Sequence, residues 1–379
     1  MLCRRSWSSL LAIGFAAVAC GADETTSGTG NTTGSNTTTA QATSSTGAGA
    51  AGGGTTTSTT SSSSSTGAGG SPGGEVRIIA IGDTGEGNTE QHCVADAMNA
   101  KCAATGCDAV LLAGDNFYEQ GVGSVDDPQW LTKFEQPYDR QTLNTLKFYI
   151  VLGNHDYAPP PFDILTNSNG DRQSQIDYSF LPVGMGAGFR YSDKWLMPDS
   201  YYDVQLGNGL LHVFGVDSQD TSDTQLNDMQ GRVAASTATW KLAFAHHPRY
   251  TSGDHQGDNE LLNTVSGFDG PSMYELLQAV YCNTDVYLCG HDHNREFIDK
   301  GIDSQCPNTH FIISGAGAKV RSSAFGAVQN SLYYEEGIEG FFYFVFTPTS
   351  LTVESYDMDA ANCAGAGTAT PAWTKTITK

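Results

Sequence analysis

Basic residues are scarce in this 379-residue sequence, which has 19 Lys and Arg against 41 Asp and Glu. The formal charge of -22 argues against electrostatic attraction to DNA, RNA or anionic lipid, so we expect no nucleic-acid partner. We interpret the acidic excess as a means of keeping the chain soluble, ahead of an acidic-tail or calcium-binding role. The scattered basic residues, Lys101 and Arg140 among them, are interpreted as solvated surface.

No run long enough to span a bilayer occurs at the N-terminus, where the apolar stretch covers only Leu10 to Val18. It follows Arg4 and Arg5 and ends in small residues before Cys20, the order of a secretory signal. The AVAC ending resembles the bacterial lipoprotein box, in which the Cys becomes N-terminal and lipidated. We therefore expect residues 1–19 to be a signal peptide and the protein to be secreted or in the cell envelope, with membrane attachment through lipidated Cys20. Plain secretion is the alternative.

Apolar residues almost disappear between Gly21 and Gly74, where Gly, Ser, Thr and Ala dominate. Such a segment cannot bury enough apolar surface to offset its ordering entropy. We interpret residues 20–75 as a disordered tether with a coil dimension of about 40 Å. The remaining residues, 76–379, are predicted to form one catalytic domain, and the 39% apolar content of the chain can support its core.

Seven of the nine cysteines lie in the predicted domain. Export permits disulfides, and Cys102 with Cys107 or Cys282 with Cys306 are candidate pairs, although sequence does not fix the connectivity. An odd number leaves at least one cysteine unpaired. Cys289 lies inside an apolar run, so we expect it to be a buried free thiol.

From Val76 onward, short β-rich runs alternate with helical patterns. The predicted strands are VRIIAI, AVLLA, KFYIVL, LHVFGV, KLAFA, DVYLC and HFIIS, and a helix is predicted around Thr89–Ala104. Because these runs are mostly continuous rather than alternating, we expect strands covered on both faces in a layered α/β domain. GFFYFVF and LTVESYDM are predicted to form an antiparallel pair.

Polar residues that bind metals directly follow five of these strands, in GDTGEG, GDNFYEQG, GNHDY, HHPRY and GHDHN. In open α/β sheets, sites form beyond the carboxyl ends of the strands. A single Gly-Asp turn is usually an ordinary loop, but five such exits in order favour a metal site. The candidate ligands are Asp83, Asp115, Asn154, His246, His291 and His293, with Tyr118 three positions after Asp115.

Mixed oxygen and imidazole ligands favour Fe, Zn, Mn or Co over Ca or Cu(I). The set is too large for one tetrahedral ion, whereas two ions about 3.5 Å apart, bridged by one carboxylate, would use all of it. Such a pair holds both the attacking and the leaving oxygen of a phosphoryl transfer. The residues therefore predict hydrolysis of a phosphate ester.

The ordered set GD…GDNFY…GNHD…HHP…GHDH resembles the calcineurin-like metallophosphoesterases, and among them the purple acid phosphatases of the small, tartrate-resistant type. Tyr118 is the distinguishing residue, because in purple acid phosphatases this tyrosinate binds Fe(III), whereas the wider superfamily usually lacks it. QIDYS, KWLMPDSYY and SGAG also fit, and the resemblance covers nearly all of Val76 to Asp359. It implies a four-layer αββα sandwich with a binuclear metal site at the C-terminal strand ends.

Each candidate residue takes a role from this resemblance. The ferric ligands would be Asp83, Asp115, Tyr118 and His293, with Asp115 bridging. A divalent site for Fe(II), Zn(II) or Mn(II) would be completed by Asn154, His246 and His291. His155 and His255 match the two outer histidines that contact phosphate and protonate the leaving group. The alternatives are that His155 only orients a ligand and that His255 is a mobile loop residue. His247 takes a position that is not usually a ligand in this family.

The implied function is a monomeric, binuclear acid phosphatase that hydrolyses phosphate monoesters by in-line attack of a metal-bound hydroxide. A phosphodiesterase or nucleotide hydrolase of the same superfamily is one alternative. Another is a tethered surface binding protein, in which the metal-ligating residues would be expected to be lost. Residues 158–190 are unusually rich in Pro and Gly for the compact enzymes, so we expect a lid over the site.

Overall fold

The computed structural model describes residues 65–66, 74–157, 171–256, 273–322, 325–358 and 370–379. The predicted signal peptide, Cys20 and nearly all of the predicted tether lie outside these ranges, so these interpretations stay predictions. Within the described ranges, no helix is both long and apolar enough to cross a membrane.

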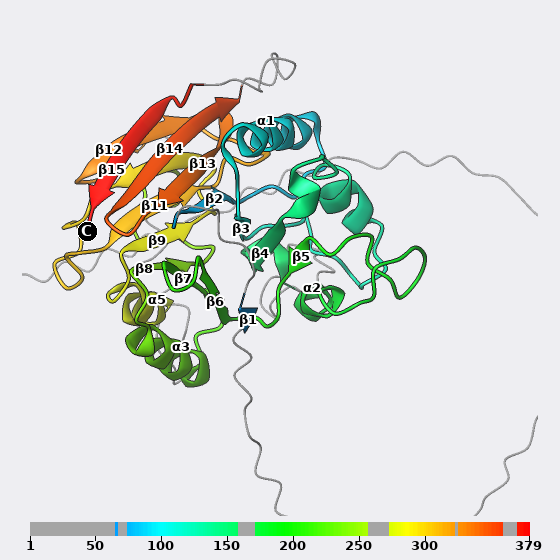
Figure 1. The fold of residues 1–379 in the computed structure, drawn as a ribbon, viewed down its shortest axis with the longest axis horizontal. Coiled ribbons are helices and arrows are strands. Elements are labelled where there is room, and N and C mark those ends of the chain that lie inside the picture. Colours follow the sequence, from blue (N-terminus) through cyan, green and yellow to red (C-terminus); the bar gives the residue numbers. More distant parts are fainter. Residues whose placement is uncertain (1–64, 67–73, 158–170, 257–272, 323–324, 359–369) are drawn as a thin grey trace, which may run out of the picture. The chain divides into compact units, whose positions relative to one another are not determined.

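Two mixed β-sheets form the centre of the domain (Figure 1). Sheet A contains, in spatial order, β1 (Ser65–Thr66), β6 (Tyr202–Leu206), β7 (Leu211–Gly215), β8 (Trp240–Phe244), β9 (Val286–Cys289), β11 (His310–Ser314), β10 (Asn294–Ile298) and β12 (Ser331–Glu336). Sheet B contains β15 (Trp373–Thr378), β14 (Ser350–Met358), β13 (Glu339–Phe346), β2 (Val76–Ile81), β3 (Ala109–Ala113), β4 (Lys147–Val151) and β5 (Trp195–Leu196).

Each sheet contains four neighbouring strands that run parallel. In sheet B, β2, β3, β4 and β5 run parallel, and in sheet A, β7, β8, β9 and β11 do so. Every residue of β3, β7, β9 and β11 is buried, as expected for continuous apolar runs covered on both faces. The predicted strands begin and end within one residue of the observed ones, and the predicted antiparallel pair is β13 with β14.

Helices cover the outer faces of the two sheets, which confirms the four-layer αββα arrangement. Helix α1 (Thr89–Thr105), predicted almost to the residue, packs on β13 and β14 of sheet B. On sheet A, α5 (Met273–Tyr281) packs against β8 and against α3 (Asp223–Ala235). Strands β10 and β11 contact β13, so the sheets pack face to face. The shorter helices are η1 (Trp130–Glu135), η2 (Leu143–Thr145), η3 (Asn154–Asp156) and α2 (Arg172–Tyr178).

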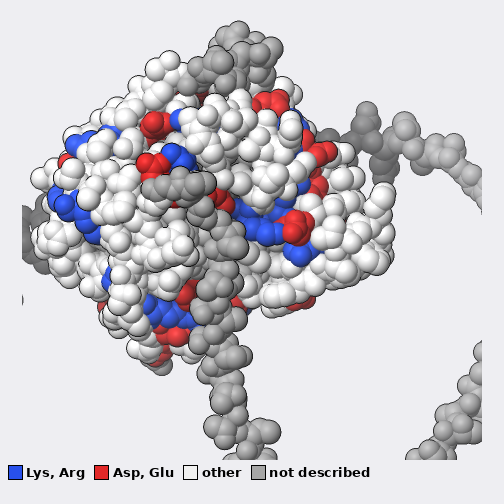
Figure 2. All heavy atoms as spheres, viewed as in Figure 1, with Lys and Arg blue, Asp and Glu red and all other residues white. Residues whose placement is uncertain are grey.

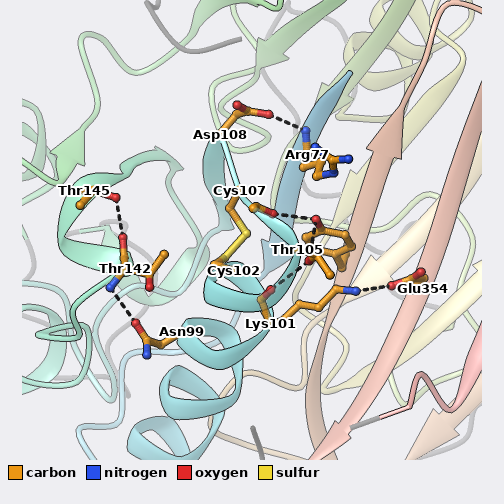
Figure 3. Close-up of a disulfide and its surroundings, with 12 residues drawn as sticks. Arg77, Asn99, Lys101, Cys102, Thr105, Cys107, Asp108, Thr142, Thr145 and Glu354 are labelled. Carbon is orange, nitrogen blue, oxygen red and sulfur yellow. Dashed lines mark hydrogen bonds and ion pairs between the residues drawn. A yellow bond between two sulfur atoms is a disulfide. The ribbon is translucent and has the colours of Figure 1, made fainter. Parts of the chain in front are cut away.

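Both candidate disulfides are confirmed. Cys102 pairs with Cys107, with a Cα–Cα distance of 5.0 Å, and joins the end of α1 to the segment before β3 (Figure 3). Cys282 pairs with Cys306. Cys289 is a buried free thiol, as predicted.

The predicted lid is only partly visible, because residues 158–170 lie outside the described ranges. Its remainder contains α2 and a loop closed by an isolated bridge between Val183 and Arg190. Met185 at the loop tip is 88% exposed. Closure over the site therefore stays a prediction.

A buried cation joins the two sheets. Arg295 of β10 is fully buried, and its Nη1 donates to Ser355 Oγ (2.9 Å), to the Tyr356 carbonyl (2.7 Å) and to Asp357 Oδ1 (2.7 Å) of β14. Its Nη2 donates to the Ile338 carbonyl at 3.2 Å. A buried charge is tolerated when it is paired and hydrogen-bonded in this way. We call these residues the Arg295 cluster.

Candidate metal centre

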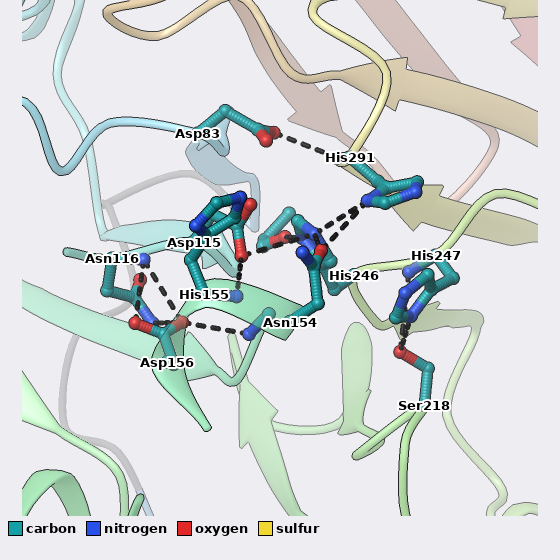
Figure 4. A network of polar contacts seen from close by, with 12 residues as sticks. Asp83, Asp115, Asn116, Asn154, His155, Asp156, Ser218, His246, His247 and His291 are labelled. Atoms are coloured by element: carbon teal, nitrogen blue, oxygen red, sulfur yellow. Dashed lines mark hydrogen bonds and ion pairs between the residues drawn. The ribbon is translucent and has the colours of Figure 1, made fainter. Parts of the chain in front are cut away.

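The seven predicted metal ligands come together at one edge of the sandwich. Three strands of sheet B (β2, β3 and β4) and two of sheet A (β8 and β9) end there, because neighbouring parallel strands present their carboxyl ends on the same side. Figure 4 shows the side chains of Asp83, Asp115, Asn154, His246 and His291 gathered at this edge.

Three of these residues have left-handed backbone conformations, which non-glycine residues rarely adopt. The φ angles are 57° at Asp83, 50° at Asp115 and 67° at His291. Hydrogen bonds hold this geometry, since the amide of Asp83 donates to the Gly114 carbonyl at 3.0 Å and that of His291 to Asp83 Oδ2 at 2.9 Å. Strained backbone of this kind concentrates at functional sites.

Glycines directly before the ligands allow the strand ends to approach closely. A Cβ atom on Gly114 would lie 2.6 Å from His246 Nδ1, and one on Gly153 would lie 2.1 Å from Asp115 Oδ1. The Gly-Asp and Gly-Asn pairs of the sequence therefore serve packing of the site as well as turn formation.

One group of candidate ligands surrounds the phenol of Tyr118, and we call it the tyrosine cluster. Tyr118 Oη lies 2.8 Å from Asp83 Oδ1, 2.8 Å from Asp115 Oδ2 and 3.2 Å from His293 Nε2. His293 Nε2 is also 3.4 Å from Asp83 Oδ1. Four side-chain atoms that can bind a metal thus converge.

A second group, the histidine cluster, is centred on His246 Nε2. That atom lies 3.0 Å from Asn154 Oδ1, 3.1 Å from His291 Nδ1 and 3.4 Å from Asp115 Oδ1. His291 Nδ1 is 3.0 Å from Asn154 Oδ1. Asp115 therefore has one carboxylate oxygen in each cluster, which is the geometry of a bridging ligand.

The protonation of these groups shows that the centre is suited to a cation. His246 Nδ1 donates to the Ala113 carbonyl at 2.9 Å, so a neutral ring turns its Nε2 lone pair toward the cluster. Burial lowers the pKa of His246, but the carboxylates of Asp115 and Asp83 outweigh it and raise the pKa to about 9. The same carboxylates would attract a metal cation to the Nε2 side of the ring.

The pKa of Tyr118 is raised as well, but in a phenol this favours the neutral form. Burial, and then the charges of Asp115 and Asp83, raise the pKa of its phenol well above the ordinary value.

Burial and then the charge of Arg321 lower the pKa of His293 to about 3, so its ring is neutral and able to bind a metal. Asp83, Asp115 and His246 place ligand atoms within 4.8 Å of one another. Carboxylates, a phenol, an amide oxygen and neutral imidazoles fit transition metals such as iron or zinc.

The two predicted outer histidines lie beside these clusters. The amide of His155 donates to Asp115 Oδ1 at 2.9 Å, and its Nδ1 is 2.8 Å from the Glu119 carbonyl, which fixes the ring orientation. The His155 ring centroid is 4.7 Å from that of Tyr118. The His255 ring lies 4.0 Å from the His291 ring. Both side chains are half-buried.

His247 is placed differently from the candidate ligands. Its ring lies 4.6 Å from the His291 ring, but its Nδ1 is hydrogen-bonded to Ser218 Oγ at 2.7 Å (Figure 4). Burial and the neighbouring His246 lower its pKa to about 3. It lines the centre without contributing to either cluster.

Sequence reasoning missed the residues that fasten the strand exits to one another. Asp156, fully buried, accepts from the amides of Asn116 (3.1 Å) and Gly153 (2.8 Å) and from Gln175 Nε2 (3.0 Å), which ties the β3 exit to the β4 exit. Asp292 accepts from Thr251 Oγ1 and thereby holds the loop that carries His255. The only signal in the sequence is that Asp156 directly follows His155 and that Asp292 lies between His291 and His293.

The fold and the centre define a metallophosphoesterase, and the sequence comparisons agree. The profile of the calcineurin-like phosphoesterases matches residues 76–295, more than half of the chain, so the chain belongs to this family. Tartrate-resistant acid phosphatase type 5 of Rattus norvegicus is 26% identical over 279 residues, covering 65% of this chain and 74% of that protein. Purple acid phosphatase 17 of Arabidopsis thaliana is 28% identical over 304 residues, covering 75% and 82%.

Solved structures confirm the fold. Purple acid phosphatase PPD1 from yellow lupin matches with a TM-score of 0.55 and 16% identity, covering 80% of this chain and 54% of that one. GAP50, the anchor in the inner membrane complex of Plasmodium, matches with a TM-score of 0.61 and 19% identity, covering 80% and 89%. The resemblance to purple acid phosphatases is therefore confirmed, and the chain is a metal-dependent hydrolase of the phosphoesterase family.

Proposed function

We propose that this protein is a purple acid phosphatase that hydrolyses phosphate monoesters at an Fe(III)–divalent metal centre. The observation that carries the proposal is the position of Tyr118, whose phenol lies 2.8 Å from the carboxylates of both Asp83 and Asp115. A buried phenol between two carboxylates has a raised pKa, so binding as tyrosinate requires a strongly charged cation such as Fe(III).

The two clusters divide the ligands between two metals. The tyrosine cluster would hold the ferric ion, and Asn154, His246 and His291 would hold Fe(II), Zn(II) or Mn(II), with Asp115 shared. When bound, the metals lower the pKa of a water and neutralise phosphate oxygens, which favours in-line attack on phosphorus.

His155 and His255 supply the proton chemistry in this proposal. Because the Nδ1 of His155 faces the Glu119 carbonyl, its Nε2 remains to meet a phosphoryl or leaving-group oxygen. His255 lies over the His291 ring, on the side of the divalent site. A protonated imidazole at either position hydrogen-bonds the phosphoryl oxygens and protonates the departing alkoxide.

Attachment through lipidated Cys20, with secretion or cell-envelope location and a monomeric state, belongs to the same proposal. It is supported by the order of basic, apolar and small residues before Cys20 and by the polar composition of residues 20–75. Mass spectrometry of the mature N-terminal peptide tests it, since a diacylglyceryl mass on Cys20 is expected and an unmodified start at another residue would contradict lipidation.

The decisive experiment is the visible spectrum of the purified protein together with metal analysis. We expect stoichiometric iron and a tyrosinate-to-iron band that disappears in Tyr118→Phe. A colourless protein that is fully active with two zinc ions would overturn the purple acid phosphatase assignment and leave the phosphoesterase one. Faster hydrolysis of a bis-ester than of its monoester would favour the phosphodiesterase alternative.

A further inference from the structure

A lysine ammonium lies over the ring of Tyr118. Lys319, in the segment after β11, places its Nζ 4.3 Å from the ring centroid. The same Nζ is 3.0 Å from Glu86 Oε1 and 2.9 Å from Glu119 Oε1. It therefore connects the segments that follow β2, β3 and β11 around the tyrosine cluster.

The contacts hold Lys319 in this position. Its side chain is 26% exposed and that of Glu86 is 24% exposed, so their ion pair is partly shielded from solvent. Glu119 is 69% exposed, and its pair with Lys319 is weakened by solvent screening. Glu86 is thus the main anchor, and Glu119 is the more dispensable partner.

The other nearby lysine contacts Tyr118 in a different way. Lys133 Nζ donates to the backbone carbonyl of Tyr118, so its charge does not lie over the phenol ring. Among the lysines of the described residues, Lys319 is the one whose ammonium lies over the ring of Tyr118.

A cation over an aromatic face is attracted by the electron density of the ring. The attraction is greater for a phenolate than for a neutral phenol, because a full negative charge replaces a quadrupole. The ammonium therefore lowers the energy of the electrons of a phenolate that is bound to a metal. The carboxylates of Glu86 and Glu119 oppose this effect.

We propose that Lys319 is a positioning residue that tunes Tyr118 as a metal ligand through its charge above the phenol ring. The inference rests on the proposed function, since it needs Tyr118 to bind iron. It goes beyond that function because it assigns the electronic state of the centre to a residue outside the set of candidate ligands.

The chain offers a matched control at a distance from the centre. Lys101 of α1 places its Nζ 4.2 Å from the Tyr343 ring centroid and 2.9 Å from Glu354 Oε2 (Figure 3 shows the pair with Glu354). The interaction has the same chemistry, a lysine that contacts a tyrosine ring and a glutamate, but Tyr343 is on β13 and is not a candidate ligand. Lys101→Met therefore reports the effect of losing such a contact without affecting the metal centre.

The test compares iron-loaded full-length variants by visible spectroscopy. In Lys319→Met, the tyrosinate-to-iron band is expected to move to longer wavelength by on the order of 10 nm, because the energy of a cation–π interaction corresponds to a shift of this size for a band in the visible range. Lys319→Arg keeps the charge and is expected to retain the wild-type band, as is Lys101→Met.

The variant Glu119→Gln distinguishes a purely structural role of Lys319 from an effect of its charge, because it breaks one of the ion pairs of Lys319 but keeps the ammonium. If Lys319 only joined loops, this variant would shift the band in the same direction as Lys319→Met. If charge acts, removing a carboxylate leaves the band at its wild-type position or moves it to shorter wavelength. Lys319→Gln replaces Lys319→Met if the latter does not fold.

Two results would overturn the inference, and they are distinguishable. A wild-type Tyr118-dependent band that is unchanged in Lys319→Met and Lys319→Gln would reject the role of Lys319 and leave the proposed function intact. A wild-type protein without any such band would reject Tyr118 as an iron ligand, and with it both proposals.

Discussion

Two buried polar clusters in this protein have their charges balanced in opposite ways. Around Arg295, one cation is surrounded by acceptors of β14 and by the Ile338 carbonyl, and the positive charge belongs to the protein itself. At the candidate metal centre, two carboxylates, a phenol and imidazoles converge, and the positive charge must come from outside or from a proton on His246.

The difference explains which cluster stabilises the fold and which performs chemistry. A buried ion pair that is complete in the polypeptide holds the two sheets together without further ligands. A set of converging acceptors is incomplete in the polypeptide alone, so it binds cations and gives them open coordination positions. On the face shown in Figure 2, basic side chains lie in small groups, several of them next to acidic ones.

The largest expected effect comes from removing the bridging carboxylate. Asp115→Asn takes an ionised ligand from both clusters, so we expect phosphatase activity to fall by on the order of 10³-fold or more and the metal content to fall with it. Activity assays and metal analysis of the purified variant check this. Retention of both metals and of activity would show that Asp115 does not bridge.

Chelation is the next test. If metal is normally present at on the order of 1,000 times its dissociation constant, removing it lowers the free energy of unfolding by about 4 kcal/mol. Denaturant titration with and without chelator measures the difference. Equal stability in both conditions would mean that the centre binds no metal in the folded protein.

Arg295→Met should lower the stability of the fold and leave the metal centre unchanged. The variant leaves Asp357 and the carbonyl of Tyr356 without their buried partner, so we expect a loss of about 3 kcal/mol in the free energy of unfolding. Metal content and activity per folded molecule are expected to stay at wild-type values. Loss of metal at unchanged stability would contradict the separation of the two clusters.

The smallest effect concerns a buried carboxylate that lacks a buried cation. Asp217 is fully buried, accepts from the Tyr157 hydroxyl, and is 3.6 Å from Arg172, whose side chain is 47% exposed. Burial raises its pKa to about 6. The pKa of Asp217 is higher in the folded state than in the unfolded state. The stabilisation from its protonated form is therefore complete below about pH 4 and is lost as the pH rises through about 6.

We therefore expect Asp217→Asn to become more stable relative to wild type by about 1 kcal/mol between about pH 5 and pH 7. Denaturant titrations of metal-free protein at the two pH values measure the change. A parallel pH dependence of Asp217→Asn and wild type would show that Asp217 does not titrate in this range.

The sequence predicted the central strands and the site well, because both depend on strong local signals. Continuous apolar runs identify buried strands, and five polar exits in one order identify the edge at which they meet. Strands β5, β6, β10, β12 and β15 were not predicted, since they are short or alternate with polar residues.

Contacts between distant segments could not be predicted in the same way. Arg295, Asp156 and Lys319 act through partners far along the chain, and no local pattern marks such pairs. The expectation that scattered basic residues are solvated surface was wrong for Lys101, whose side chain is 14% exposed and lies over the Tyr343 ring. A charged residue can be covered by neighbours that only the fold brings near.

The left-handed backbone at Asp83, Asp115 and His291 also bears on how the protein matures. An unfolded chain does not hold these residues in that conformation, and the seven candidate ligands come from both sheets. The centre therefore forms only when both sheets have packed, and the metals are acquired in whichever compartment the chain completes its folding. Metal supply in that compartment therefore decides what the centre contains.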